Sequence, residues 1–335
     1  MITALILLLL VIVVALAFEF ANGANDAANA IATVVSTKVL SPRTAILFAA
    51  VFNFLGAFAG TKVAATIGSG IVKMSAIDQP VILCALIGAA FVTTVATKFG
   101  VPISCSHALI GGLLGSAVAH YGFEVVHLTK LLEKVIFPMF ACPFVGFIVG
   151  FLFMLALLWI FAKTAPERIN KKFKFLQVIS AGFMAFSHGS NDAQKVMGII
   201  ALGLMTFKTS LYPDVAHEFF VPIWVIFLCA STMGLGTAIG GWKVINTIGH
   251  RMLRLKPIHG FAAETTASGV ILTASFFGFP VSTTHIIATA IMGVGSTIRL
   301  SAVKWGIVGR IVTAWFLTIP LTAAISAMLY KLFVW

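Results

Sequence analysis

Gly23-Ala24-Asn25-Asp26 lies in the middle of an apolar stretch near the start of the chain, and the same pattern returns as Gly189-Ser190-Asn191-Asp192. A carboxylate beside a carboxamide is costly to place in hydrocarbon, so one such pair at membrane depth already indicates a functional site. Two copies, 166 positions apart, indicate a duplicated unit.

A second pattern is duplicated as well. Phe99-Gly-Val-Pro-Ile-Ser-Cys-Ser-His107 matches Phe277-Gly-Phe-Pro-Val-Ser-Thr-Thr-His285, 178 positions later. The two separations differ by no more than the length of a loop. The sequence therefore predicts a first transmembrane repeat over 1–162, a basic cytoplasmic linker over 163–174 and a second transmembrane repeat over 175–335.

The composition predicts a polytopic membrane protein. Hydrophobic residues make up 60% of the 335 positions and charged residues only 10%, whereas about a quarter of a soluble domain is charged. The net charge of +12 would suggest nucleic acid in a soluble protein, but here the basic residues cluster in short loops between apolar segments, which is the pattern of a membrane topology signal. The four cysteines stand singly, without metal-ligand spacing, and are expected to serve packing.

Apolar runs of about 20 residues indicate the membrane spans. We expect an all-α polytopic fold of two inverted-topology repeats, with broken helices and re-entrant-like helical hairpins. The helices are expected to break near Asn22-Gly23 and His188-Gly189, and the hairpin 79–119 near Gly100-Pro102. The complete set of expected segments is 1–35, 43–61, 79–119 and 131–162 in the first half and 175–205, 221–242, 258–298 and 303–334 in the second.

Loop charge predicts the orientation. The linker carries five basic residues against the single acid Glu167, and basic loops stay in the cytoplasm. Tracing outward from a cytoplasmic linker leaves both termini extracytoplasmic in the cell membrane. An odd number of crossings in each half makes the repeats opposite in orientation, as in many secondary transporters. The basic residues of the linker are Lys163, Arg168, Lys171, Lys172 and Lys174.

The Gly-x-Asn-Asp motifs predict cation sites. Glycine is permissive, and Asn and Asp side chains offer the backbone competing hydrogen bonds, so each motif is expected to interrupt its helix and free carbonyl oxygens. Together with side-chain oxygens these are hard ligands that suit Na⁺, and an Asp can alternatively carry a proton. The residues expected to hold the coupling cation are Asn25, Asp26, Asn191 and Asp192.

The Pro-x-Ser motifs predict an anion seat. Proline is best tolerated at a helix start, and hydroxyl residues beside it are good N-caps. Free backbone N–H groups, hydroxyl donors and the positive end of the helix dipole then converge, which favours phosphate or sulfate. The residues expected to line the seat are Ser104, Cys105, Ser106, Ser282, Thr283 and Thr284. For His107 and His285 we weigh contact with the anion or proton coupling against a bond to a backbone carbonyl.

Several polar groups have no counterpart in the other half. Glu264 corresponds to the apolar Leu86 and is a candidate cation ligand or proton carrier, and so is Glu19. Lys195 follows Asp192 by three residues, so a local ion pair is expected. Asn53 is a candidate supporting group.

Two carboxylates beside a bound anion would repel one another at low dielectric, so cations must enter too. Anion-cation symport by alternating access follows, with a sulfate symporter as the nearest alternative to phosphate. An intramembrane Ser/His hydrolase and a passive channel are further readings. The duplicated Ser and His elements and the missing Gly-x-Ser-x-Gly elbow disfavour the hydrolase, and the occluded seat disfavours the channel. No catalytic residue is assigned.

At these residues the chain closely resembles the inorganic phosphate transporter family, whose members carry both duplicated signatures. The resemblance covers essentially the whole chain and implies inverted repeats, cation-coupled uptake and phosphate bound near the bilayer midplane. It also implies a role in transport for Glu264, in Gly260-Phe-x-x-Glu264, whereas Asn53 stands where animal relatives have a glutamate. Inorganic phosphate, the lipid bilayer and Na⁺ or H⁺ are the expected partners. No other cofactor and no nucleic acid is expected, and a homodimer is left open.

Overall fold

The computed structural model describes residues 2–73, 77–212, 219–251 and 255–334, which form helices and turns without a β-strand. The first half holds α1 (Ile2–Ser36), α2 (Pro42–Gly56), α3 (Lys62–Gly70), α4 (Gln79–Phe99), α5 (Cys105–Tyr121), α6 (Leu128–Leu131) and α7 (Phe137–Ile160). The second half holds α8 (Pro166–Leu211), α9 (Ile223–Ile239), α10 (Trp242–Asn246), α11 (Pro257–Phe276), α12 (Thr283–Ser296) and α13 (Trp305–Phe333).

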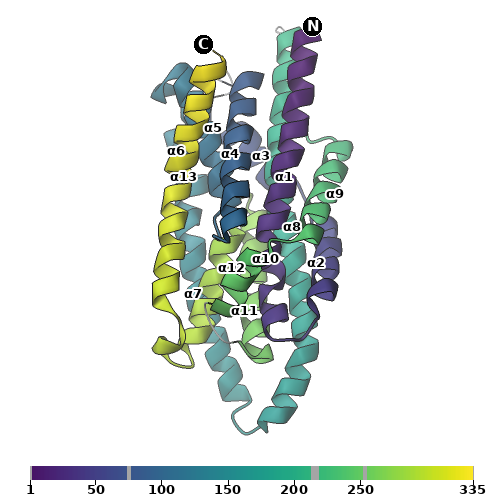
Figure 1. Ribbon diagram of the computed structural model, residues 1–335, viewed down its shortest axis with the longest axis vertical. Coiled ribbons are helices and arrows are strands. Elements are labelled where there is room, and N and C mark those ends of the chain that lie inside the picture. Colours follow the sequence, from purple (N-terminus) through teal and green to yellow (C-terminus); the bar gives the residue numbers. More distant parts are fainter. Residues whose placement is uncertain (1, 74–76, 213–218, 252–254, 335) are drawn as a thin grey trace.

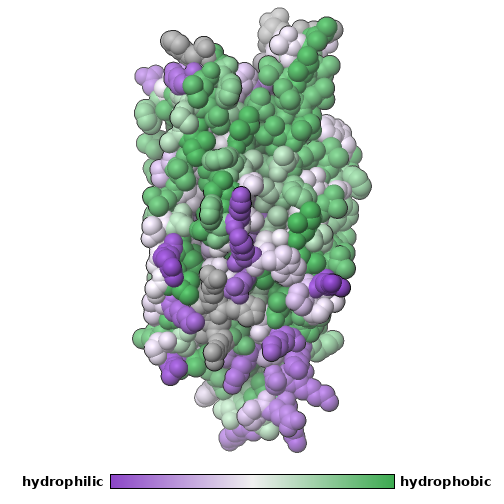
Figure 2. Space-filling view, in the orientation of Figure 1, coloured by the Kyte–Doolittle hydropathy of each residue, from purple (hydrophilic) through white to green (hydrophobic). Residues whose placement is uncertain are grey.

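The described helices confirm a membrane protein. Four are long and apolar enough to cross a bilayer, and a fifth span results if α9 and its continuation, bent by 64°, count as one. Figure 2 shows a broad hydrophobic surface along the molecule, with hydrophilic residues gathered at one end. That end holds the connection between α7 and α8 (Figure 1). An apolar side surface is what lipid tails require, because they cannot hydrogen-bond to polar groups.

Helices that the predicted duplication would pair with one another run in opposite directions (Figure 1). α1 descends from the end that carries both termini, whereas α8 rises from the opposite end. α2 and α9 are opposed in the same way, and so are α7 and α13. The helices also exchange neighbours, since α1 packs on α9 and α8 packs on α2.

The two predicted hairpins are present, as α4–α5 and α11–α12. Each turns at a glycine in the left-handed region, Gly100 at φ 71° and Gly278 at φ 74°, where a side chain would be strained. The second helix of each hairpin starts one residue after a serine cap. Ser104 Oγ accepts from the backbone N–H of His107 at 3.2 Å, and Ser282 Oγ accepts from that of His285 at 3.3 Å. These are N-caps as the sequence predicted.

The expected breaks at the Gly-x-Asn-Asp motifs are wrong, because α1 and α8 run through them as continuous helices. The glycines serve packing instead. A Cβ on Gly23 would lie 2.5 Å from the carbonyl oxygen of Met233, and one on Gly189 would lie 2.1 Å from that of Asn53. Close backbone approach therefore explains both glycines, and the motifs offer side-chain oxygens rather than unwound carbonyls.

The first long helix of the second half starts earlier than the expected segment 175–205. α8 begins at Pro166 rather than at residue 175, so most of the segment 163–174 is helical. Proline at the first helical position is well suited to start a helix, because its missing N–H would have no partner there. Four of the basic residues of this segment thus lie on the first turns of α8, and Lys163 precedes the helix.

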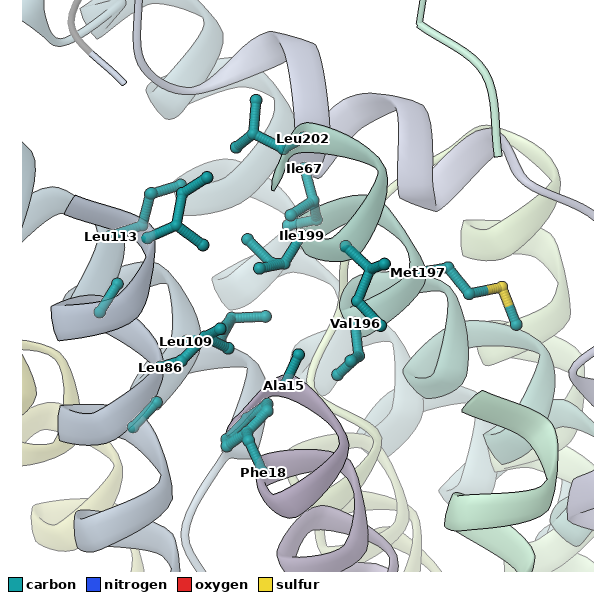
Figure 3. Close-up of a cluster of buried hydrophobic side chains, with 14 of the residues drawn as sticks. Ala15, Phe18, Ile67, Leu86, Leu109, Leu113, Val196, Met197, Ile199 and Leu202 are labelled. Atoms are coloured by element: carbon teal, nitrogen blue, oxygen red, sulfur yellow. The ribbon is translucent and has the colours of Figure 1, made fainter. Parts of the chain in front are cut away.

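Apolar side chains from both halves share a core (Figure 3). Phe18 of α1 lies beside Leu86 and Leu109 of the first hairpin, and Val196 and Ile199 of α8 belong to the same cluster. All five are almost fully buried. This packing fixes the motif-bearing segments of α1 and α8 against the hairpin.

Candidate functional site

The carboxylates of the two Gly-x-Asn-Asp motifs meet at one histidine. Nε2 of His188 lies 3.7 Å from Oδ2 of Asp26 and 3.3 Å from Oδ2 of Asp192. All three side chains are buried, and their ligand atoms lie within 4.8 Å of one another. The cluster thus joins α1 to α8 and brings together two groups separated by 166 positions.

A lysine adds a positive charge to this cluster of two aspartates and a histidine. The ammonium of Lys195 forms a salt bridge with Asp192 and donates to the hydroxyl of Ser106. It also donates to the backbone carbonyl of Val281 at 2.7 Å. Both Lys195 and Asp192 are buried, so the predicted local ion pair is present, but it also reaches both hairpins. A buried pair of this kind needs such additional hydrogen bonds to offset its desolvation.

The start of α12 contacts the two carboxylates, and the start of α5 contacts Lys195 and the second hairpin. Thr283 Oγ1 donates to Asp192 at 3.1 Å, and Thr284 Oγ1 donates to Asp26 at 3.1 Å. Ser106 Oγ donates to the carbonyl of Val281 at 3.0 Å. Thr283 and Thr284 of the predicted anion seat therefore contact two of the predicted cation residues directly, whereas Ser106 contacts Lys195.

The two motif asparagines make equivalent contacts. Asn25 Nδ2 donates to Thr97 Oγ1 at 2.7 Å in the first hairpin, and Asn191 Nδ2 donates to Ser275 Oγ at 2.8 Å in the second. Asn191 Nδ2 also reaches the carbonyl of Phe279 at 3.1 Å. The Oδ1 atoms of Asn25 and Asn191 are buried and have no hydrogen-bond partner among the described residues. These oxygens remain available to a cation.

The imidazole rings of His107 and His285 lie against each other, and that of His285 also contacts Trp315. Their ring centroids are 4.6 Å apart, edge to face, and the His285 ring stacks on Trp315 at 3.8 Å. Both line a cavity of about 170 Å³ together with residues of α7 and α13. Their backbone N–H groups, rather than their rings, donate to the capping Oγ atoms of Ser104 and Ser282. The described contacts pair no serine hydroxyl with either imidazole, so they provide no Ser/His hydrolytic pair.

Glu264 forms a separate buried site. Its carboxylate accepts from Thr33 Oγ1, from Ser180 Oγ and, at 3.2 Å, from Gln177 Nε2. The three partners come from α1 and α8, whereas Glu264 belongs to α11. Glu264 itself is fully buried. The carboxylate thus connects the second hairpin to both motif-bearing helices.

Other predicted polar groups support the cluster indirectly. Asn53 Oδ1 lies 3.0 Å from Nδ1 of His188, and Asn53 Nδ2 donates to Thr237 Oγ1 at 3.0 Å. The Asn53 side chain thus orients the imidazole. Glu19 accepts from Asn22 Nδ2 at 3.3 Å, and its other oxygen has no hydrogen-bond partner among the described residues.

Sequence reasoning did not assign His188, Thr33, Gln177 or Ser180 to a site. His188 could have been found, because it directly precedes the second Gly-x-Asn-Asp motif and stands one turn before Asp192 on the same helix. The three partners of Glu264 carry no comparable signal. They are single polar residues without a duplicated counterpart in a motif, and only the fold brings them together.

Apolar spans, a fully buried group of carboxylates and cationic side chains, and two helix starts aimed at that group define a multi-pass membrane transport protein. Residues 22–326 match the phosphate transporter family. The chain belongs to this family, whose members are transporters and not enzymes.

Relatives and a solved structure agree with that assignment. The chain is 44% identical over 325 residues to a probable low-affinity inorganic phosphate transporter of Rhizobium meliloti (strain 1021), covering 97% of this chain and 96% of the relative. It is 41% identical to the protein of the same description from Bacillus subtilis (strain 168), covering 97% of each chain. A structure described as the sodium-dependent phosphate transporter superposes with a TM-score of 0.89 at 25% identity, covering 97% of this chain and 98% of the other.

Proposed function

We propose that this protein is a secondary active transporter that imports inorganic phosphate by symport with a cation, Na⁺ or H⁺, through alternating access. The observation that carries the proposal is the meeting of Asp26 and Asp192 at the start of α12, where the Thr284 and Thr283 hydroxyls donate to them. An anion can stay beside two carboxylates at low dielectric only if cations accompany it. Coupling is therefore built into the binding site.

Phosphate binds where the two hairpins restart as helices. The hydroxyls and first backbone N–H groups there are donors at the positive ends of two helices, a known arrangement for tetrahedral anions. The Thr283 and Thr284 hydroxyls now donate to carboxylates and can turn toward an anion instead. The proposed seat consists of Ser104, Cys105, Ser106, Ser282, Thr283 and Thr284, with His107 and His285 behind it.

The carboxylates hold the coupling cation. Asp26 and Asp192 supply charged oxygens, and the unpartnered Oδ1 atoms of Asn25 and Asn191 supply neutral ones. Hard oxygen ligands of this kind suit Na⁺. Glu264 is a second, separate position for a cation or proton, since its carboxylate is buried and surrounded by Thr33, Ser180 and Gln177.

Alternating access follows from two inverted repeats, 1–162 and 175–335, that carry the site between them. The opposed directions of α1 and α8 and the exchange of neighbours between α2 and α9 support this architecture. A basic segment at 163–174 favours the cytoplasm for the α7–α8 connection, with both termini outside the cell.

Uptake into proteoliposomes tests the proposal. Purified protein is reconstituted, and radiolabelled phosphate uptake is measured under an inward Na⁺ gradient and, separately, under an inward H⁺ gradient. At least one gradient should drive phosphate accumulation, and excess unlabelled phosphate should compete much better than sulfate. A phosphate uptake rate that is the same with and without each gradient would overturn symport. Equal competition by sulfate and phosphate would overturn phosphate selectivity.

A further inference from the structure

Lys195 stands where the first half of the chain has Asn29. Both follow the motif aspartate by three residues, and their separation is the same 166 positions that relates Asp26 to Asp192. The hairpin partners correspond as well, since Ser106 and Thr284 are 178 positions apart. Each half of the site therefore has a carboxylate and a hydroxyl. The halves differ at one position, where the first has the carboxamide of Asn29 and the second has the ammonium of Lys195.

On the first half, Asn29 leaves an oxygen without a partner. Its Nδ2 donates to Thr284 Oγ1 at 2.9 Å and lies 3.3 Å from Thr283 Oγ1. Its Oδ1 is buried and has no hydrogen-bond partner among the described residues. Thr284 in turn donates to Asp26. A carboxylate, a hydroxyl and an unpartnered carboxamide oxygen thus gather on this half, and all three are ligand types that Na⁺ accepts.

On the second half, the ammonium of Lys195 contacts the corresponding oxygens. It binds the Asp192 carboxylate, the Ser106 hydroxyl and, at 2.7 Å, the Val281 carbonyl. Lys195 is 2% exposed, so solvent cannot supply these contacts. A carboxylate, a hydroxyl and a backbone carbonyl are the oxygen ligands that a bound Na⁺ would use, and the ammonium is a compact point charge of the same sign.

We propose that the Lys195 ammonium is a built-in cation, which permanently occupies the position that a mobile coupling cation would take beside Asp192. Within the central cluster, only the half with Asp26 and Asn29 then remains open to a mobile cation, so Asp192 serves the fixed charge of Lys195, and the separate Glu264 position is unaffected. This inference rests on the proposed symport function and specifies its stoichiometry. The central cluster of this chain takes one mobile cation fewer per phosphate than a cluster with asparagine on both halves.

The test replaces Lys195 by the residue found at the corresponding position of the first half. Lys195→Asn gives the second half the residue of the first and leaves space beside Asp192. Lys195→Met keeps most of the length of the unbranched side chain but removes the charge, so it fills most of that space with an apolar group. Wild type and both variants are reconstituted, and the uptake of radiolabelled Na⁺ and phosphate is measured in parallel. We expect the ratio of Na⁺ to phosphate to rise by one in Lys195→Asn, and Lys195→Met to lose phosphate accumulation without gaining Na⁺.

A binding measurement provides a readout that needs no transport. Thermal unfolding in detergent is followed in NaCl and in choline chloride at equal ionic strength. We expect Na⁺ to raise the unfolding midpoint of Lys195→Asn more than that of wild type, because an added ligand site stabilises the folded state. Lys195→Met should show no such gain.

Two results would overturn the inference. One is a Lys195→Asn protein that transports phosphate with the wild-type Na⁺ ratio and shows no added stabilisation by Na⁺. The other is loss of phosphate binding in Lys195→Asn at every Na⁺ concentration, which would make Lys195 a phosphate ligand. A wild-type protein that moves no phosphate would contradict the proposed function instead, and the unfolding comparison would still decide on Lys195.

Discussion

Gly189 of α8 lies against the backbone of Asn53 in α2, so closely that a Cβ at Gly189 would lie 2.1 Å from the Asn53 carbonyl oxygen. The same relationship holds between Gly23 and Met233, at 2.5 Å. Asn53 also orients His188, the residue before Gly189. The glycine contact therefore fixes the helix pair that carries half of the site.

Replacing Gly189 by alanine should destabilise the protein. The added methyl group meets backbone rather than a flexible side chain, so α8 and α2 must separate, at a cost of about 1–3 kcal/mol. Gly269→Ala is the control, because a Cβ there meets nothing within 4 Å. Thermal unfolding in detergent should show a lower midpoint for Gly189→Ala and an unchanged or higher one for the control. Equal midpoints would contradict the packing role.

The glycines illustrate what sequence alone could and could not predict. The hairpins and caps followed from patterns with a local cause, such as the left-handed turn at Gly100 and the Ser104 cap. The role of Gly23 and Gly189 did not, because glycine permits both an unwound helix and a close helix contact. Only the neighbouring helix decides between them.

Removing the two serine caps should weaken phosphate binding. Ser104→Ala with Ser282→Ala deletes two hydroxyl donors, and each hydrogen bond to a charged anion contributes about 1.5–3 kcal/mol. The change also removes two N-caps, at about 0.5–2 kcal/mol of stability each. Ser41→Ala is the matched control, because Ser41 accepts from the backbone of Thr44 in the same way but caps the distant α2. Equilibrium binding of labelled phosphate should weaken in the double variant and not in the control. Wild-type affinity in the double variant would remove both serines from the seat.

Glu264→Gln should impair cation-driven uptake while the protein still folds. A glutamine can occupy the same volume between Thr33 and Ser180, but it cannot carry the negative charge that binds a cation. Glu167→Gln is the control, since Glu167 is an exposed acid at the start of α8. Initial rates of phosphate uptake at saturating phosphate and varied cation concentration should show reduced cation dependence only in Glu264→Gln. Identical cation dependence in both variants would exclude Glu264 from coupling.

The connection between α7 and α8 should face the cytoplasm. A cysteine at Lys171, in a background without the four native cysteines, should resist impermeant thiol reagents in intact cells. A cysteine at Lys130 on α6, which lies toward the opposite end of the molecule (Figure 1), should react. Labelling of Lys171→Cys from outside, with protection of Lys130→Cys, would reverse the proposed orientation.

The site was predictable as far as it is duplicated. The Asn-Asp and Pro-x-Ser motifs each predicted a polar group at membrane depth. If both halves contribute to one binding site, the two motifs are expected to contact each other, as Asp26 and Thr284 do. The asymmetric members were harder. Lys195 was expected only to pair with Asp192, because helix periodicity predicts contacts between residues three or four positions apart. The contact with Ser106 comes from another part of the chain, so periodicity could not predict it.

The most direct test of cation-coupled phosphate transport is accumulation against a gradient. Proteoliposomes are loaded with labelled phosphate at the same concentration as the bath, and an inward gradient of the coupling cation is then imposed. Wild-type protein should raise the internal phosphate above the bath until the cation gradient dissipates, and Asp26→Asn should leave it at the bath level. Internal phosphate that stays equal to the bath in the wild type would contradict symport, and accumulation by Asp26→Asn would contradict the role of its carboxylate.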